Sequence, residues 1–119
     1  NAVKPPLSPP QAVFPIVWTI LYALMGVSAG IVWNETKRTE NLYLFFFQLF
    51  FNYLWTIIFF GFKYYMFAFV WLVILISLVI AMIASFRKVS KAAANLQIPY
   101  LLWISFAAYL NFAAWLLNK

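Results

Sequence analysis

YMFAFVWLVILISLVIAMIASF, at residues 65–86, is a run of 22 residues without a charged side chain. A helix rises about 1.5 Å per residue, so this run can cross a hydrocarbon core about 30 Å thick. Further uncharged runs occupy residues 12–33, 42–60 and 96–117. Because lipid offers no water to peptide groups, such runs predict helices, and the chain is expected to be an all-α transmembrane helix bundle.

The composition points the same way. Of the 119 residues, 67% are hydrophobic and 8% are charged, whereas soluble domains carry about 25% charged residues. Cysteine and histidine are absent, which excludes disulfides and Cys/His metal sites. All the charged residues lie outside the four apolar runs, so no Asp, Glu, Lys, Arg or His is expected at membrane depth, which argues against ion-coupled transport and carboxylate catalysis.

The chain reads as a single domain, residues 1–119, with spans at about 12–33, 42–60, 65–86 and 91–117. Short connections make consecutive helices antiparallel neighbours. Ser90 is expected to cap the last helix and Pro99 to bend it. The proline-rich segment NAVKPPLSPPQ, residues 1–11, is either a tail or an ordered cover over one end of the bundle.

The basic residues are divided between the two ends of the predicted bundle. One end carries five, and the other, with the proline-rich segment, carries three. This bias weakly places the first end in the cytoplasm of a bacterial cell, with the chain as a multi-pass protein of the cell membrane. The basic residues form no contiguous run, so we expect no nucleic-acid partner.

Polar and aromatic side chains recur at helical spacing inside the spans. Gln48 and Asn52 lie one turn apart with Trp55 nearby, and Trp18 and Tyr22 share a face of the first span. Hydrogen bonds between polar side chains join helices in membranes, and this structural role is the favoured interpretation of Gln48. Aromatic residues can likewise form belts at the membrane surface.

The depth of Trp103 argues against a belt position. At 1.5 Å per residue it lies roughly 22 Å from the surface at the C-terminal end. The faces that carry Trp18, Asn52 and Trp103 can therefore line one pocket, open towards the proline-rich end. Such a pocket suits a large, flat, mostly apolar ligand. Separately, Gly26 and Gly30 form a GxxxG pair, which favours close helix packing within the chain or in a dimer.

Three motifs resemble those of the TspO/MBR family, the tryptophan-rich sensory proteins and translocator proteins (peripheral-type benzodiazepine receptors). KP at 4–5, PP at 9–10, PIVWTILYALMG at 15–26 and VW at 32–33 resemble its first loop and second helix. QL at 48–49, NY at 52–53, Trp55 and IFFG at 58–61 resemble its third helix. PYLLW at 99–103, FA at 106–107 and LN at 110–111 resemble its fifth.

The resemblance implies a five-helix bundle, often a homodimer, with no required cofactor. Its pocket binds protoporphyrin IX, haem, and isoquinoline or benzodiazepine drugs. The implied ligand-binding positions are Trp18, Tyr22, Asn52, Trp55, Trp103, Phe106, Ala107 and Leu110. Pro5, Pro9 and Pro10 match a loop that forms a lid over the pocket. Some bacterial members degrade protoporphyrin in light, and for such an activity Trp18 and Trp103 are the implied catalytic residues.

The chain departs from the family pattern in three places. It starts at the first loop, so the first of five helices is expected to be missing. Leu7 stands where a loop tryptophan is usual. Phe112 occupies the aromatic position of the proposed cholesterol motif, which needs tyrosine, so cholesterol binding through that motif is not supported.

Three functions remain open on this basis. The favoured prediction is a membrane receptor or sensor that binds porphyrin-type tetrapyrroles and other flat hydrophobic molecules. The alternatives are a transporter of tetrapyrroles or similar molecules and a slow, light-dependent porphyrin-degrading enzyme.

Overall fold

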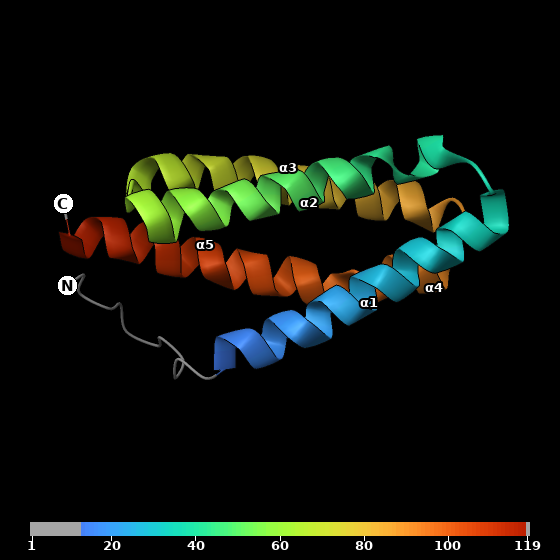
Figure 1. The fold of residues 1–119 in the computed structure, drawn as a ribbon, viewed down its shortest axis with the longest axis horizontal. Helices are drawn as coiled ribbons and strands as arrows, with labels where there is room; N and C mark the ends of the chain where they lie inside the picture. The colour runs from blue at the N-terminus through green and yellow to red at the C-terminus, as the bar shows by residue number, and fades with distance from the viewer. Residues whose placement is uncertain (1–12, 119) are drawn as a thin grey trace.

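The computed structural model describes residues 13–118, which form helices joined by short turns (Figure 1). Within this part of the chain, four helical segments are long and apolar enough to cross a membrane: Val13–Thr36, Thr39–Phe62, Tyr65–Arg87 and Lys91–Asn118. The predicted all-α transmembrane fold is therefore confirmed, with four spans in the described residues.

The first span is a single helix, and the second combines three helical types. α1 (Val13–Thr36) has 24 residues and is therefore about 36 Å long. The second span begins with a 3₁₀ turn, η1 (Thr39–Leu42), continues as α2 (Tyr43–Thr56) and ends in a π-helix, η2 (Ile57–Phe62). Lys37 and Lys63 end these spans in the left-handed conformation, with φ of 54° and 57°.

The other two spans are α3 (Tyr65–Arg87) and the pair α4 (Lys91–Leu96) and α5 (Ile98–Asn118). α3 packs between α2 and α5 (Figure 1). The indole of Trp71 on α3 stacks on Phe51 of α2 at 4.5 Å between ring centroids and donates to the Phe51 carbonyl at 2.9 Å. On the other side of α3, the ring of Phe69 packs on that of Phe112 of α5, with 5.2 Å between ring centroids. These contacts make α3 the central helix of the bundle.

The last span is broken between α4 and α5. The Ser90 hydroxyl accepts from the Ala93 amide at 3.2 Å, which confirms the predicted cap. The amide of Gln97 bonds the Ala94 carbonyl at 3.1 Å, a 3₁₀-type bond. The Ala93 carbonyl accepts from the buried Ser28 hydroxyl of α1 at 2.7 Å. Because the Gln97 N–H bonds Ala94, the Ala93 carbonyl is left for Ser28, and this bond ties α1 to α4.

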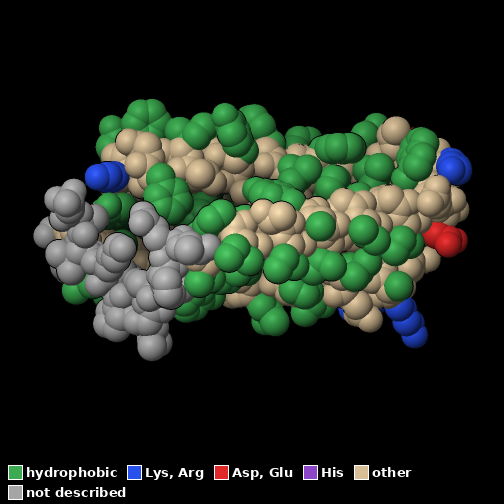
Figure 2. Space-filling model, turned by 60° about the horizontal axis from the view of Figure 1, so that its bottom comes forward, with side chains coloured by type: hydrophobic (Ala, Val, Ile, Leu, Met, Phe, Trp, Pro, Cys, Tyr) green, Lys and Arg blue, Asp and Glu red, His purple; other side chains and the backbone are tan. Residues whose placement is uncertain are grey.

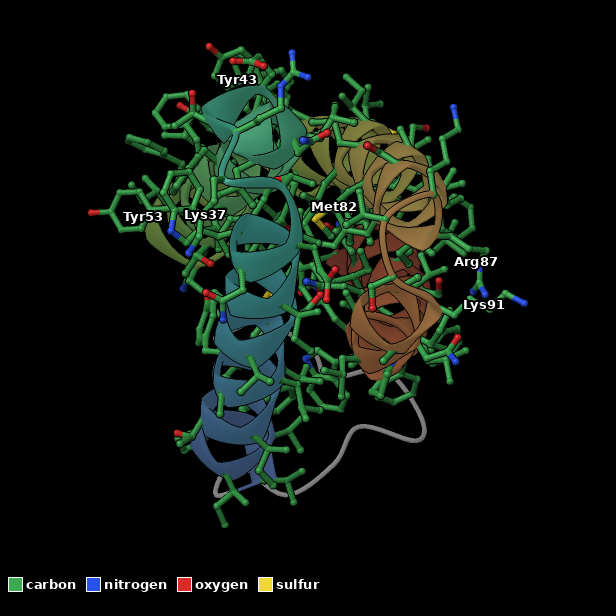
Figure 3. All side chains as sticks on the ribbon, turned by 90° about the vertical axis from the view of Figure 1, so that its right-hand side faces the viewer. Lys37, Tyr43, Tyr53, Met82, Arg87 and Lys91 are labelled. Carbon is green, nitrogen blue, oxygen red and sulfur yellow. The ribbon has the colours of Figure 1, made fainter. Side chains whose placement is uncertain are left out.

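The outer surface matches a bilayer. Hydrophobic side chains cover the middle of the molecule, and the charged side chains lie at its ends (Figure 2). Lys37, Arg87 and Lys91 lie at one end, seen end-on in Figure 3, where Tyr53 points outward and Met82 points into the bundle. An apolar groove on the outer face of α2, lined by Tyr43, Phe46, Phe47 and Phe50, belongs to this lipid-facing surface.

The GxxxG pair makes no close helix contact within the described residues. A Cβ atom built on Gly26 or Gly30 meets nothing within 4 Å. Close packing of the two glycines inside this part of the chain, one of the two interpretations of the motif, is therefore not observed.

Candidate ligand-binding site

Two aromatic side chains of α1 project side by side at one turn's spacing. Trp18 and Tyr22 stack with ring centroids 5.5 Å apart and an interplanar angle of 27°. The i and i+4 positions of a helix lie on one face, which is why these rings meet. Trp18 is half-buried and Tyr22 remains 47% exposed. The pair therefore presents an accessible aromatic surface.

α5 brings two more rings to the same place. The ring of Trp18 meets Tyr100 and Trp103 edge-on, each at 6.3 Å between centroids. Phe14 contacts Trp103 from the start of α1 at 5.8 Å. Tyr100 is fully buried, and Trp103 is half-buried like Trp18. We call Trp18, Tyr22, Tyr100 and Trp103 the aromatic site.

Behind these rings, a hydrogen-bond network joins α1, α2 and α5. The Tyr22 hydroxyl donates to Asn52 Oδ1 at 3.3 Å, and Asn52 Nδ2 donates to the Tyr100 hydroxyl at 2.7 Å. The Tyr100 hydroxyl in turn donates to Gln48 Oε1 at 2.6 Å. Gln48, Asn52 and Tyr100 are at most 1% exposed. We call these four residues the amide–tyrosine network.

The network gives hydrogen-bond partners to polar groups that neither lipid nor apolar side chains could pair. Each buried amide or hydroxyl would carry a free-energy cost if it were unpaired. Its members are all neutral, and the described residues hold no cluster of His, Cys, Asp or Glu that could bind a metal. The site can therefore supply stacking surfaces and neutral hydrogen bonds, without a carboxylate or imidazole for acid–base catalysis.

Of the predicted ligand-binding residues, Trp18, Tyr22, Asn52 and Trp103 come together in the aromatic site and the network. Phe106 extends the site along α5, with its ring 5.8 Å from Trp103. The remaining α5 positions, Ala107 and Leu110, are half-buried. The predicted lid residues Pro5, Pro9 and Pro10 lie outside the described residues.

Trp55 belongs to a different cluster. Its indole N–H donates to Asn111 Oδ1 at 2.9 Å, and Asn111 Nδ2 donates to the Tyr65 carbonyl at 2.7 Å. Its ring stacks on Phe59 of the π-helix at 5.3 Å. Trp55 is 6% exposed, so in this structure its indole joins α2, α3 and α5.

Tyr100 is the residue that sequence reasoning did not place in the site. It is the centre of the network, with a hydroxyl that both accepts and donates. A signal was available: a tyrosine hydroxyl deep within an apolar span needs a buried partner. Asn111 shares its helix face, but the partners of Tyr100 lie on α2, 48 and 52 residues earlier in the chain.

These features define an integral membrane helix bundle with an aromatic, uncharged candidate site where α1 meets α5. The sequence profile of the TspO/MBR family matches residues 1–116, and the chain belongs to this family. The chain is 39% identical to the tryptophan-rich protein TspO of Chlorobaculum tepidum, over 98% of this chain and 76% of that protein. It is 38% identical to the tryptophan-rich sensory protein of Cereibacter sphaeroides, over 99% and 75% of the two chains. It is 36% identical to the translocator protein of Ovis aries, over 98% and 72%.

Proposed function

We propose that the protein is a membrane receptor that binds porphyrin-type tetrapyrroles and other flat hydrophobic molecules at the aromatic site. One observation carries this proposal. The half-buried indoles of Trp18 and Trp103 come from two helices and meet edge-on at 6.3 Å, in front of a buried, uncharged hydrogen-bond network. Rings held in this way offer a ready-made stacking surface at low ordering cost.

The chemistry of the site selects for the shape and charge of the ligand. Stacked and edge-on rings favour a wide, flat π system. Tyr22 adds an exposed hydroxyl that suits a neutral hydrogen-bonding group, and the buried Asn52 accepts from that hydroxyl on the inner side. The network is uncharged, and a buried carboxylate without a cationic partner carries a large free-energy cost. Acidic substituents of a porphyrin are therefore expected at the exposed edge beside Tyr22.

A titration in detergent or nanodiscs tests the proposal. We expect protoporphyrin IX and haem to bind with a shift of their own absorption band, and Trp103→Ala to weaken binding by about 1–3 kcal/mol, taking base stacking on aromatic side chains as the analogy. Trp33→Ala is the matched control, because Trp33 lies at the far end of α1 beneath Lys37. Equal affinity of wild type and Trp103→Ala would contradict the site assignment.

Light-dependent loss of the bound porphyrin is a second candidate activity, and the edge-on contact of two oxidisable indoles favours it. Under illumination with protoporphyrin IX, Trp18→Phe and Trp103→Phe are expected to slow pigment loss while retaining an aromatic ring. Trp71→Phe, on the α2–α3 contact, is the control. Equal pigment loss in every sample would remove this activity.

Other properties implied by the resemblance remain predictions. These are isoquinoline or benzodiazepine binding, a homodimer, and the contacts of Trp55, Phe106, Ala107 and Leu110 with ligand. Transport of tetrapyrroles is the alternative to a receptor, and reconstitution in vesicles separates the two. Binding without flux supports the receptor, whereas saturable, ligand-specific flux supports a transporter.

A further inference from the structure

Gln97 is the unexplained polar residue of the bundle interior. Its side chain is 0% exposed, yet neither Nε2 nor Oε1 has a hydrogen-bond partner among the described residues. Buried side-chain amides in folded proteins are nearly always paired with protein or with ordered water. An amide that is fully buried inside a membrane protein therefore indicates a partner other than the neighbouring side chains.

The backbone around Gln97 is where a helix is interrupted. Gln97 separates α4 from α5, and Pro99 follows two residues later without an N–H group. Interruptions of this kind in membrane helices are tolerated because side chains or ordered waters pair the freed backbone groups. On the α1 side, the Ser28 hydroxyl already pairs the Ala93 carbonyl at 2.7 Å. Gln97 lies one turn further along the same span, without an equivalent partner.

A second buried amide nearby is only partly satisfied. Gln48 accepts from the Tyr100 hydroxyl through Oε1, but the contact of its Nε2 is with the Met25 sulfur at 3.9 Å. A thioether is a weak acceptor. Gln97 and Tyr100 are three residues apart and both fully buried, so Gln97 lies one turn from the tyrosine whose hydroxyl donates to Gln48.

From these observations we infer that Gln97 forms a buried water site, in which one water accepts from Gln97 Nε2 and Gln48 Nε2 and donates to Gln97 Oε1. Water is a small neutral molecule with both donors and acceptors, as the two amides require. A charged occupant does not fit, because Gln48, Gln97, Met25 and Tyr100 are all neutral. The water extends the amide–tyrosine network from Tyr22 to the break between α4 and α5. This inference is independent of which ligand the aromatic site binds.

Nuclear magnetic resonance on the whole chain in nanodiscs, with ¹⁵N-labelled glutamine, tests the inference directly. We expect the side-chain amide protons of Gln97 to show a cross-relaxation peak with water, of the sign that marks a long-lived bound molecule. Loss of one signal in Gln97→Met provides the assignment. Absence of any such peak at Gln97 in the wild-type protein would overturn the inference.

The thermal stability of a double variant distinguishes a shared water from a simple packing role of the two glutamines. Gln97→Met and Gln48→Met each remove one side of the bridge with little change in volume. We expect the loss of thermal stability in the double variant to be smaller than the sum of the two single losses, because neither amide is then left without its water. Ile104→Met, at a buried position of α5, is the control and should show additive shifts with Gln48→Met. Additive shifts for the Gln48 and Gln97 pair would overturn the shared water.

Discussion

Tyr100→Phe removes a single oxygen atom from the centre of the amide–tyrosine network. The hydroxyl accepts from Asn52 Nδ2 at 2.7 Å and donates to Gln48 Oε1 at 2.6 Å. The phenylalanine ring keeps the shape of the side chain and the edge-on contact with Trp18. The substitution therefore isolates the two hydrogen bonds from the packing of the ring.

The magnitude follows from the number of groups left unpaired. In a buried site, each polar group without a partner costs about 1–3 kcal/mol in soluble proteins. In membranes the average is nearer 0.6 kcal/mol per bond, with a maximum near 1.7, because helices in the unfolded state find other partners. Two bonds are lost here, and Asn52 keeps its bond from Tyr22. We therefore expect the free energy of unfolding to fall by about 1–3 kcal/mol.

Unfolding in mixed micelles with increasing dodecyl sulfate, followed by circular dichroism, measures this change. Tyr53→Phe is the matched control, since Tyr53 is 66% exposed on the outer face of α2. Its free energy of unfolding should stay within about 0.5 kcal/mol of wild type, as is usual for surface positions. A loss below about 0.5 kcal/mol for Tyr100→Phe, or equal losses for the two variants, would refute the view that the network stabilises the bundle.

Two further substitutions separate stabilising residues from ligand-binding ones. Trp55→Phe leaves Asn111 Oδ1 without its donor, so we expect a loss of about 0.6–1.7 kcal/mol in the same unfolding assay. Its effect on porphyrin affinity should be smaller than that of Trp103→Ala, and a larger effect would place Trp55 in the ligand site. Ser28→Ala breaks the 2.7 Å bond to the Ala93 carbonyl at the α4–α5 break, with an expected loss of about 0.5–1.5 kcal/mol. An unchanged unfolding curve for Ser28→Ala would show that this bond does not hold α1 to α4.

The fold could be read from the sequence because the bilayer imposes a single strong rule. Uncharged runs of about 20 residues must become helices when no water is present to pair their peptide groups. The rule is less precise at helix ends. α1 continues to Thr36, three residues beyond the predicted boundary, because backbone bonding persists into polar residues at the membrane surface.

The candidate site could be read only in part. Trp18 and Tyr22 lie one turn apart, so helical geometry alone places them together. The family resemblance added Asn52 and Trp103, which also lie in or behind the aromatic site. Trp55 follows Asn52 by three residues, a spacing that puts two side chains on neighbouring parts of a helix surface, yet its indole donates to Asn111. Helical spacing identifies a shared face but does not specify which neighbouring helix that face contacts.

The residue pattern along the chain established that the protein is a membrane helix bundle, with its charges at the ends and little but aromatic and amide groups for ligand chemistry. It did so because hydropathy and helical period act locally along the chain. The pairing of the polar groups is visible only in the folded bundle. Tyr100 joins Asn52 and Gln48, Ser28 meets the Ala93 carbonyl, and Gln97 stays without a protein partner among the described residues. These pairings depend on how helices from distant parts of the chain pack, and local spacing carries no information about that packing.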